Sequence, residues 1–312
     1  MNDRKESMLA VTVDVEDWYH IPSVTGSPFS KYSTVNDFFN KWKGRYDFLS
    51  DSTKRILDLL DDLGVRATFF IVVDVINYYP GLLEKIVERG HEIACHGFHH
   101  ICFLHPQTKK PLISQAQFES QISQGKRKLE EVAGQEIIGF RAPNAYIAGW
   151  MLDSLERVGY KYDSSVSLNS LSNKLDSKPK RVGTAPYYPK QGSLEVGEEE
   201  RILEIPWPHW NIWGLRFPTA GGPFLRFFGA KYIMAGLKQC LQKGHTVFYF
   251  HPIDICREKF PGNFSLYRPF YWLTKGGYVE RRIRYILSHI NAEFGTCRNI
   301  WERVKQEKKN PK

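Results

Sequence analysis

The sequence predicts an α/β protein built around a mainly parallel sheet, and three observations carry this prediction. Short apolar runs alternate with longer amphipathic segments along most of the 312 residues, which is the order expected of parallel strands joined by crossover helices. Reactive polar side chains directly follow several of the apolar runs. The chain is also long enough to bury one large core, so a single domain with insertions fits its length.

The N-terminal half is expected to alternate strands with helices. Its strands are apolar runs rich in β-branched and aromatic residues. Its helices carry apolar residues at helical spacing and begin or end at residues such as Ser52, Gly64, Pro80 and Gly90, which favour helix termini. The expected order is strand 8–13, helix 52–63, strand 65–73, helix 80–90, strand 91–95, helix 114–133 and strand 137–140.

The C-terminal half continues the alternation with shorter and more widely spaced elements. We expect helix 149–158, strand 160–163, strand 202–205, helix 229–243, strand 246–250 and helix 278–292. Residues 18–50 and 168–200 lack this periodicity, and stretches of that length are typical of insertions. An aromatic loop with Trp207, Trp210 and Trp213 precedes the helix 229–243.

The basic character of the chain favours some partners over others. The formal net charge is +9, with concentrations of Lys and Arg in residues 174–190 and 301–312. Such segments attract an anionic membrane surface or a phosphate-bearing substrate, although ordinary solubilising charge explains them equally well. No RNA-binding signature or helix-turn-helix pattern is visible, so we expect no nucleic-acid partner.

The cysteines and the N-terminus favour a location in the cytoplasm. The five Cys are odd in number and form no C-x-x-C pair, which favours reduced thiols over a disulfide framework. The first apolar run ends at Asp14, too early to span a bilayer, and no cleavable signal precedes it. We therefore expect a cytoplasmic protein, with peripheral contact at the inner face of the membrane.

A histidine pair is the most informative motif. His96 and His100 are separated by three residues, a spacing that lets two imidazoles converge on one metal ion when the chain turns helically between them. A carboxylate must complete the set, and Asp14, Glu16 and Asp17 follow the first strand as the natural suppliers. Two histidines at this spacing, taken alone, more often lie in a solvated turn. Whether they bind a metal therefore depends on the other residues of the chain.

Five reactive residues occupy equivalent places in the predicted fold. Each lies at the C-terminal end of an expected strand: Asp14, His96, Arg141, Asp163 and His251. In parallel α/β barrels this is the rim on which active sites are built. One such residue would be a coincidence, whereas five predict a site.

With these residues placed, the chain resembles the polysaccharide deacetylases with a NodB homology domain, carbohydrate esterase family 4. The resemblance covers roughly residues 8–255 and rests on ordered motifs, namely Thr12 to Asp17, His96 to His100, Arg141-Ala142-Pro143 and Phe250-His251-Pro252. Gly97 stands where the family usually has a hydroxyl side chain. The stretches 162–165 and 221–226 are similar to a bacterial subgroup associated with exopolysaccharide or O-antigen assembly.

The resemblance implies a distorted (β/α)7 barrel that removes N-acetyl groups from an amino sugar with Zn²⁺, or another divalent metal such as Co²⁺ or Ni²⁺. It assigns residues 1–255 to the barrel, with insertions at about 18–50 and 168–200, and residues 256–312 to a helical C-terminal extension with a basic tail. The implied substrate is an N-acetylated glycan or a lipid-linked sugar, which the aromatic loop would contact.

The reaction chemistry suggests roles for these residues. Amide hydrolysis needs an activated water, stabilisation of an oxyanion and a proton for the leaving amine. We expect Asp14 to act as the base, held by Arg141 through a bidentate contact. His251 would protonate the amine, with a carboxylate such as Asp163 keeping it charged. An ion pair of purely structural importance is the alternative for Arg141 and Asp163, and a core histidine is the alternative for His251.

The acidic cluster leaves the metal carboxylate open. Strand alternation puts Asp14 and Glu16 on one face and Asp17 on the other, unless the strand has already turned. A D-x-D spacing favours Asp14 as base with Glu16 as ligand, whereas an ungapped alignment makes Glu16 the base and Asp17 the ligand. We expect Asp14 as base and Asp17, His96 and His100 as metal ligands.

Two other functions compete with N-deacetylation. One is a metal-free amidohydrolase acting on a small cyclic amide, and the other is a catalytically inactive carbohydrate-binding barrel. Relatives of the first kind tend to lose a metal histidine, and here His96 and His100 are both present. The retention of every motif argues against the second.

Overall fold

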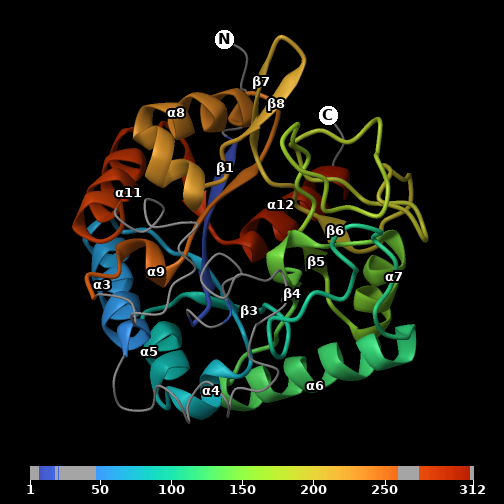
Figure 1. Cartoon of the computed structure of the whole chain (residues 1–312), viewed down its shortest axis with the longest axis horizontal. Helices are drawn as coiled ribbons and strands as arrows, with labels where there is room; N and C mark the ends of the chain where they lie inside the picture. The colour runs from blue at the N-terminus through green and yellow to red at the C-terminus, as the bar shows by residue number, and fades with distance from the viewer. Residues whose placement is uncertain (1–6, 18–19, 21–46, 259–273, 310–312) are drawn as a thin grey trace.

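A curled parallel sheet forms the centre of the molecule (Figure 1). The computed structural model describes residues 7–17, 20, 47–258 and 274–309, so the predicted insertion over 18–50 lies almost wholly outside it. The strands are β1 (Met8–Val15), β2 (Thr68–Ile71), β3 (Glu92–Cys95), β4 (Gly139–Phe140), β5 (Tyr162–Asp163), β6 (Leu203–Glu204), β9 (Thr246–Phe250) and β10 (Glu293–Gly295). Their order is β10-β1-β2-β3-β4-β5-β6, with β9 also paired to β1, and every pairing is parallel.

Helices cover the outer side of this sheet, as expected for an α/β fold, and the C-terminal helix packs on its inner side (Figure 1). They are α3 (Phe48–Asp62), α4 (Val75–Tyr78), α5 (Leu82–Glu88), α6 (Gln115–Ala133), α7 (Gly149–Val158), α8 (Pro223–Leu241), α9 (Pro252–Ile255), α11 (Gly277–His289) and α12 (Cys297–Lys309). The predicted α/β class and the strand–helix alternation are therefore confirmed. Within the described residues, no helix is both long enough and apolar enough to cross a membrane.

Some boundaries differ from the sequence-based expectations for local reasons. Asp47 caps α3, because its side chain accepts a hydrogen bond from Ser50 N at 3.0 Å, whereas the expected cap Ser52 lies buried inside the helix. Helix α8 begins at Pro223 rather than at residue 229, and its backbone breaks at Gly229, where φ is 83°. The prediction captured only the second half of α8.

The aromatic loop is a two-stranded hairpin. Strand β7 (His209–Ile212) pairs antiparallel with β8 (Leu215–Pro218). The turn residues Trp213 and Gly214 have φ of 49° and 84°, the left-handed values that a tight hairpin turn requires. A Trp at the first turn position is unusual, which explains why the turn was not predicted.

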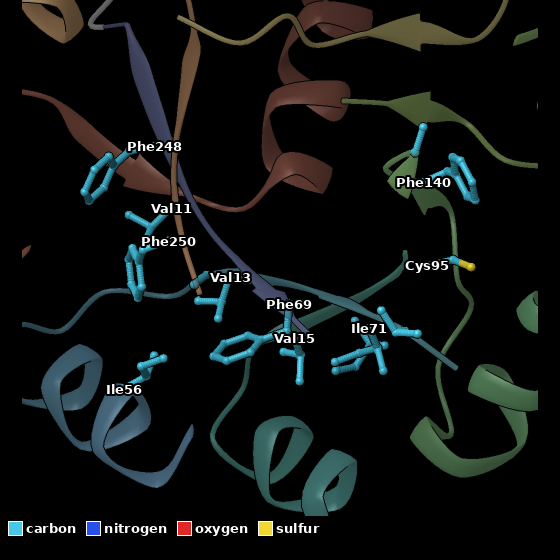
Figure 2. Packing of buried hydrophobic residues seen from close by; sticks show 14 of the residues in the cluster. Val11, Val13, Val15, Ile56, Phe69, Ile71, Cys95, Phe140, Phe248 and Phe250 are labelled. Carbon is cyan, nitrogen blue, oxygen red and sulfur yellow. The ribbon is translucent and has the colours of Figure 1, made fainter. Parts of the chain in front are cut away.

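Alternate residues of β1 face two different packed regions. Figure 2 shows Val11, Val13 and Val15 beside Phe69, Phe248 and Phe250, in the cluster between the sheet and the outer helices. The intervening residues Met8 and Ala10 instead join an inner cluster with Tyr162, Val247 and Ile300 of α12. Asp14 has the same parity as Met8 and Ala10, so β1 directs this carboxylate toward the inner side of the curled sheet.

The C-terminal segment is part of this architecture rather than a loose tail. Strand β10 pairs with Met8–Ala10 of β1. Helix α12 then places Cys297 and Ile300 in the inner cluster, both fully buried. The predicted basic tail over 301–312 is thus helical as far as Lys309.

Candidate active site

His96, His100 and one carboxylate of the acidic cluster converge on a single point. Glu16 Oε1 lies 3.0 Å from Nε2 of His96 and 3.0 Å from Nε2 of His100. All three side chains are buried, and their ligand atoms form a compact set that could hold a metal ion. We call Glu16, His96 and His100 the metal group.

A loop, not a helical turn, brings the two imidazoles together. Gly97 and His100 have φ of 79° and 54°, so the chain reverses between the histidines instead of following the helical path expected from the sequence. A Cβ on Gly97 would lie 2.9 Å from Pro143 Cγ. The absence of a side chain at Gly97 therefore lets this loop pack against the Arg141-Ala142-Pro143 motif.

The other ring nitrogens fix the orientation of both imidazoles. His96 Nδ1 lies 2.8 Å from Arg141 O, and His100 Nδ1 lies 2.9 Å from His20 O. Because a carbonyl oxygen only accepts, each Nδ1 carries a proton, and a neutral imidazole then presents a lone pair at Nε2. Both lone pairs are directed at the Glu16 carboxylate, which also only accepts.

This arrangement fits a divalent cation. Either extra protons or a cation must lie among the three acceptor atoms, and two imidazolium rings with centroids 4.9 Å apart would repel each other. Buried His100 Nε2 also has no hydrogen-bond partner among the described residues. Two imidazoles and a carboxylate are a donor set that suits Zn²⁺ and related metals.

Asp17, which the sequence analysis placed among the metal ligands, lies outside the metal group. Its Oδ2 accepts a hydrogen bond from the Tyr79 hydroxyl, and its backbone N–H donates to His20 Nδ1. Strand β1 ends at Val15, so both carboxylates follow the strand, and the chain there directs Glu16 toward the histidines. The structure thus places Glu16, and not the expected Asp17, beside His96 and His100.

His99 lies apart from the metal group as well. Its Nδ1 is 2.7 Å from Asp74 Oδ2, and the ring is half exposed. His99 was not among the expected metal ligands, and its ring lies against Asp74 instead.

Arg141 holds Asp14 beside the metal group. Its guanidinium donates from Nη1 to Asp14 Oδ1 at 2.6 Å and to Thr12 Oγ1 at 2.9 Å. The other two nitrogens donate to Ser164, one to its carbonyl and one to its hydroxyl. The guanidinium carbon also lies 4.0 Å from the centroid of the Phe70 ring. These contacts engage all three nitrogens of the guanidinium group, so Arg141 binds only one Asp14 oxygen instead of the expected two.

His251, which directly follows β9, lies beside Asp14 and the metal group. Its Nε2 lies 3.8 Å from Glu16 Oε1 and 4.0 Å from Asp14 Oδ2. Its Nδ1 lies 3.1 Å from Asp254 Oδ2, which also accepts from the His251 backbone N–H at 2.8 Å. The other Asp254 oxygen lies 3.2 Å from Nε of Arg226. Asp254 and Arg226 are both buried and were missed by the sequence analysis.

The charges around His251 keep its imidazole protonated. Burial lowers the pKa of His251, but the Glu16, Asp254 and Asp14 carboxylates outweigh burial and raise the pKa to about 9. Burial likewise raises the pKa of Glu16, yet His100 and His251 hold that pKa well below its usual value. The site thus pairs an anionic carboxylate face with one cationic imidazole.

Asp163 does not contact His251, in contrast to the expected pairing. Its Oδ1 accepts from Ser165 Oγ at 2.7 Å, and Ser165 Oγ in turn accepts from Ala142 N. Burial raises the pKa of Asp163 and of its neighbour Glu204, so the two carboxyls share a proton. Asp163 therefore supports the backbone around Arg141. The place next to His251, which was expected for Asp163, is occupied by Asp254.

Of the three aromatic residues expected beside the site, Trp207 lies there. Its indole N–H donates to Ser164 O at 2.9 Å, and its ring centroid is 5.4 Å from the Arg141 guanidinium carbon. Trp210 packs against Tyr232 instead, and Trp213 at the hairpin tip is exposed.

Two family models match parts of the chain. Residues 32–162 match the polysaccharide deacetylase family, and residues 177–302 match a domain of unknown function, DUF3473. Residues 32–162 are therefore similar to the polysaccharide deacetylases. The DUF3473 match begins within the region that the sequence analysis assigned to the barrel and includes both Arg226 and Asp254.

Several curated relatives are similar over part of their length. A peptidoglycan deacetylase-like protein of Gibberella zeae is 33% identical over 117 residues, covering 36% of this chain and 32% of that protein. Two peptidoglycan-N-acetylglucosamine deacetylases of Bacillus cereus are 28% and 25% identical, covering 35% and 55% of this chain and 47% and 63% of their own. The match thus spans less than two thirds of each of these relatives.

Solved structures show the same fold. A Mycobacterium smegmatis protein assigned to the polysaccharide deacetylases superposes with a TM-score of 0.63 at 20% identity, over 99% of this chain and 94% of that one. A carbohydrate esterase family 4 pseudoenzyme from Bacillus anthracis gives a TM-score of 0.51 at 11% identity, over 95% of this chain and 66% of that one. Because the fold also occurs in a pseudoenzyme, activity has to be argued from the site residues.

Proposed function

We propose that this protein is a metal-dependent hydrolase that removes N-acetyl groups from an amino sugar. One observation carries the proposal: the metal group, the Asp14–Arg141 pair and the His251–Asp254 pair meet at one buried point. These are a cation site, a held carboxylate and a charged imidazole, which together meet the needs of amide hydrolysis.

Glu16, His96 and His100 would hold the metal. When bound there, Zn²⁺, Co²⁺ or Ni²⁺ supplies Lewis-acid chemistry, which polarises a carbonyl group and acidifies water. The loop at Gly97 and the two Nδ1 contacts keep both imidazoles turned toward Glu16. In this assignment Glu16 takes the ligand role first given to Asp17, so Asp14 keeps the role of base.

Asp14 and His251 would handle the protons. Arg141 occupies Oδ1 of Asp14, whereas Oδ2 faces His251 Nε2 at 4.0 Å. Asp14 Oδ2 removes a proton from the attacking water, and the Nε2–H of His251 protonates the nitrogen as the acyl C–N bond breaks. The products are acetate and a free amino sugar, so atoms and charge balance.

We further propose that the substrate belongs to a bacterial surface-glycan or exopolysaccharide pathway, as an N-acetylated glycan or a lipid-linked sugar. The similarity of residues 221–226 to the corresponding subgroup supports this. The position of this stretch is a further support, since Arg226 contacts Asp254 and Asp254 contacts His251.

Acetate release tests the proposal. Purified protein loaded with Zn²⁺ would be assayed on N-acetylated chito-oligosaccharides, lipid-linked sugars and nucleotide sugars, with allantoin as a small cyclic amide. Acetate release that chelation abolishes and Zn²⁺ restores supports the proposal. Chelator-resistant hydrolysis of the cyclic amide would favour a metal-free amidohydrolase, and saccharide binding without turnover would favour an inactive barrel.

A further inference from the structure

An exposed aromatic surface lies on the hairpin and α8, away from the catalytic groups. Trp213 at the hairpin tip is 98% exposed, Leu215 of β8 is 53% exposed and Phe228 of α8 is 60% exposed. Large apolar side chains left in water at this density mark an interaction site. We call Trp213, Leu215 and Phe228 the hairpin–helix surface.

Ring contacts join the two parts of this surface. Phe228 lies 4.8 Å from Tyr232, and Tyr232 lies 5.7 Å from Trp210 of β7, measured between ring centroids. Leu215 pairs with Ile212 and Phe217 pairs with Trp210 in the hairpin register, so the two β8 side chains share the face of Trp210. The apolar surface is therefore continuous from α8 to the outer end of the hairpin.

The segment that carries this surface has charge of one sign. Between Glu204 and Asp254 the sequence contains no Asp or Glu, but it contains Arg216, Lys231, Lys238 and Lys243. Lys231 and Lys238 are exposed on α8. An aromatic surface flanked by cations, without intervening carboxylates, complements the interface of a bilayer rich in anionic lipids.

Both ends of the hairpin segment contact residues next to the catalytic groups. At the start, Trp207 Nε1 donates to Ser164 O, which also receives Arg141 Nε. At the end, Ala220 O accepts from the backbone N–H of Tyr249, two residues before His251. The segment that carries the hairpin is thus joined at both ends to neighbours of the catalytic groups, so a bilayer bound at the hairpin tip would be linked to the site through this segment.

We propose that the hairpin–helix surface docks the protein onto an anionic lipid bilayer. Trp213 and Phe228 insert among the headgroups, and Lys231 and neighbouring cations contact lipid phosphates. This differs from the sequence-based expectation for residues 301–312, because α12 packs against the protein and some of its cations already contact other groups of the chain. Arg303 donates to Glu293, and the Lys308 ammonium lies 4.3 Å from the Tyr188 ring centroid.

Vesicle co-sedimentation tests the docking proposal with the full chain. Vesicles of phosphatidylcholine alone are compared with equimolar phosphatidylcholine and phosphatidylglycerol. The protein should bind the anionic vesicles and not the neutral ones, and binding should fall as salt is raised. Trp213→Ala with Phe228→Ala should weaken binding by roughly tenfold or more, and Lys231→Glu by roughly tenfold.

Matched controls separate docking from general effects. Leu171→Ala removes an apolar side chain that is 62% exposed elsewhere, and Lys161→Glu reverses an exposed charge outside the surface. Both should bind vesicles as the unmodified protein does. Every variant should hydrolyse a soluble N-acetylated oligosaccharide normally, so a failure of the proposed activity would be seen independently of docking.

Three outcomes would overturn the proposal. They are absence of binding to anionic vesicles, binding that survives Trp213→Ala with Phe228→Ala, and a dimer in solution that these substitutions dissociate. The last result would make a second copy of the chain the occupant of the surface.

Discussion

At the scale of single residues, the choice between Glu16 and Asp17 is the sharpest question about the site. Glu16→Gln should abolish stoichiometric Zn²⁺ binding, because two imidazoles alone hold the ion weakly. Asp17→Asn should retain the metal, since Asp17 faces Tyr79. Metal analysis of the purified variants measures both, with His99→Ala as a histidine control that keeps its metal. Zinc lost from Asp17→Asn and kept in Glu16→Gln would reverse the assignment.

Asp254 provides a second test at this scale. Asp254→Asn keeps an oxygen for the His251 backbone N–H but removes the negative charge next to Nδ1. The protonated imidazole, which acts as the acid, is then less stabilised and less firmly oriented. We expect kcat to fall by about 10²-fold, with KM and bound zinc unchanged, and Asp254→Glu to recover part of the rate. Steady-state kinetics measures kcat and KM, and metal analysis measures the bound zinc. A variant as fast as the unmodified enzyme would show that Asp254 has no positioning role.

Most site residues could be predicted individually, because each lies at the C-terminal end of a strand or directly after it. This holds for Asp14, His96, Arg141 and His251. The ligand carboxylate was harder, since the answer depends on where β1 ends relative to Glu16 and Asp17. The partner of His251 was missed although Asp254 has the spacing of a helix-capping residue, and Arg226 comes from a distant segment that no local pattern connects to the site.

At the scale of elements, His91 makes the pairing of β2 and β3 sensitive to pH. Its Nδ1 accepts a hydrogen bond from Ala67 N at 3.2 Å just before β2. Burial and the nearby Arg66 charge lower the pKa of His91 to about 4. Above pH ~6.5, the imidazole is neutral in both the folded and unfolded chain. Below that, the unfolded chain binds a proton that the folded chain does not.

The unfolding free energy should therefore decrease as the pH falls from ~6.5 toward 4, by up to roughly 3 kcal/mol from this residue. Urea unfolding at several pH values measures the effect. His91→Asn can still accept the Ala67 N–H bond but does not titrate, so its stability should depend less on pH. His289→Asn, an exposed control, should behave like the unmodified protein. Equal pH dependence in His91→Asn would contradict the prediction.

The elements were predicted best where local signals were strong. Helix α6 starts within one residue of its expected range of 114–133, because Ser114 forms a capping box with Gln117, and α7 matches its expected range. Helix α12 and strand β10 were missed for a different reason. The segment around Glu293–Gly295 is too short to show alternation, and its strand conformation depends on pairing with β1.

At the scale of the whole molecule, α12 should contribute directly to stability. Ile300 is fully buried in the inner cluster, so Ile300→Ala should lower the unfolding free energy by about 2–5 kcal/mol. Denaturant unfolding provides the measurement, and exposed Glu302→Ala on the same helix should change little. If Ile300→Ala were as stable as Glu302→Ala, α12 would be an appendage and not part of the core.

The pairing of β1 also constrains the order in which this chain can fold during synthesis. Residues Leu9–Val13 pair with β9, and Met8–Ala10 pair with β10. Both partners are translated long after β1, so this strand must wait with just β2 available beside it. Asp14 and Glu16 are therefore made well before the strands that complete their surroundings, and they reach their final positions late. Such distant contacts slow folding, and they leave a nascent chain without a working site until β9 and β10 have been made.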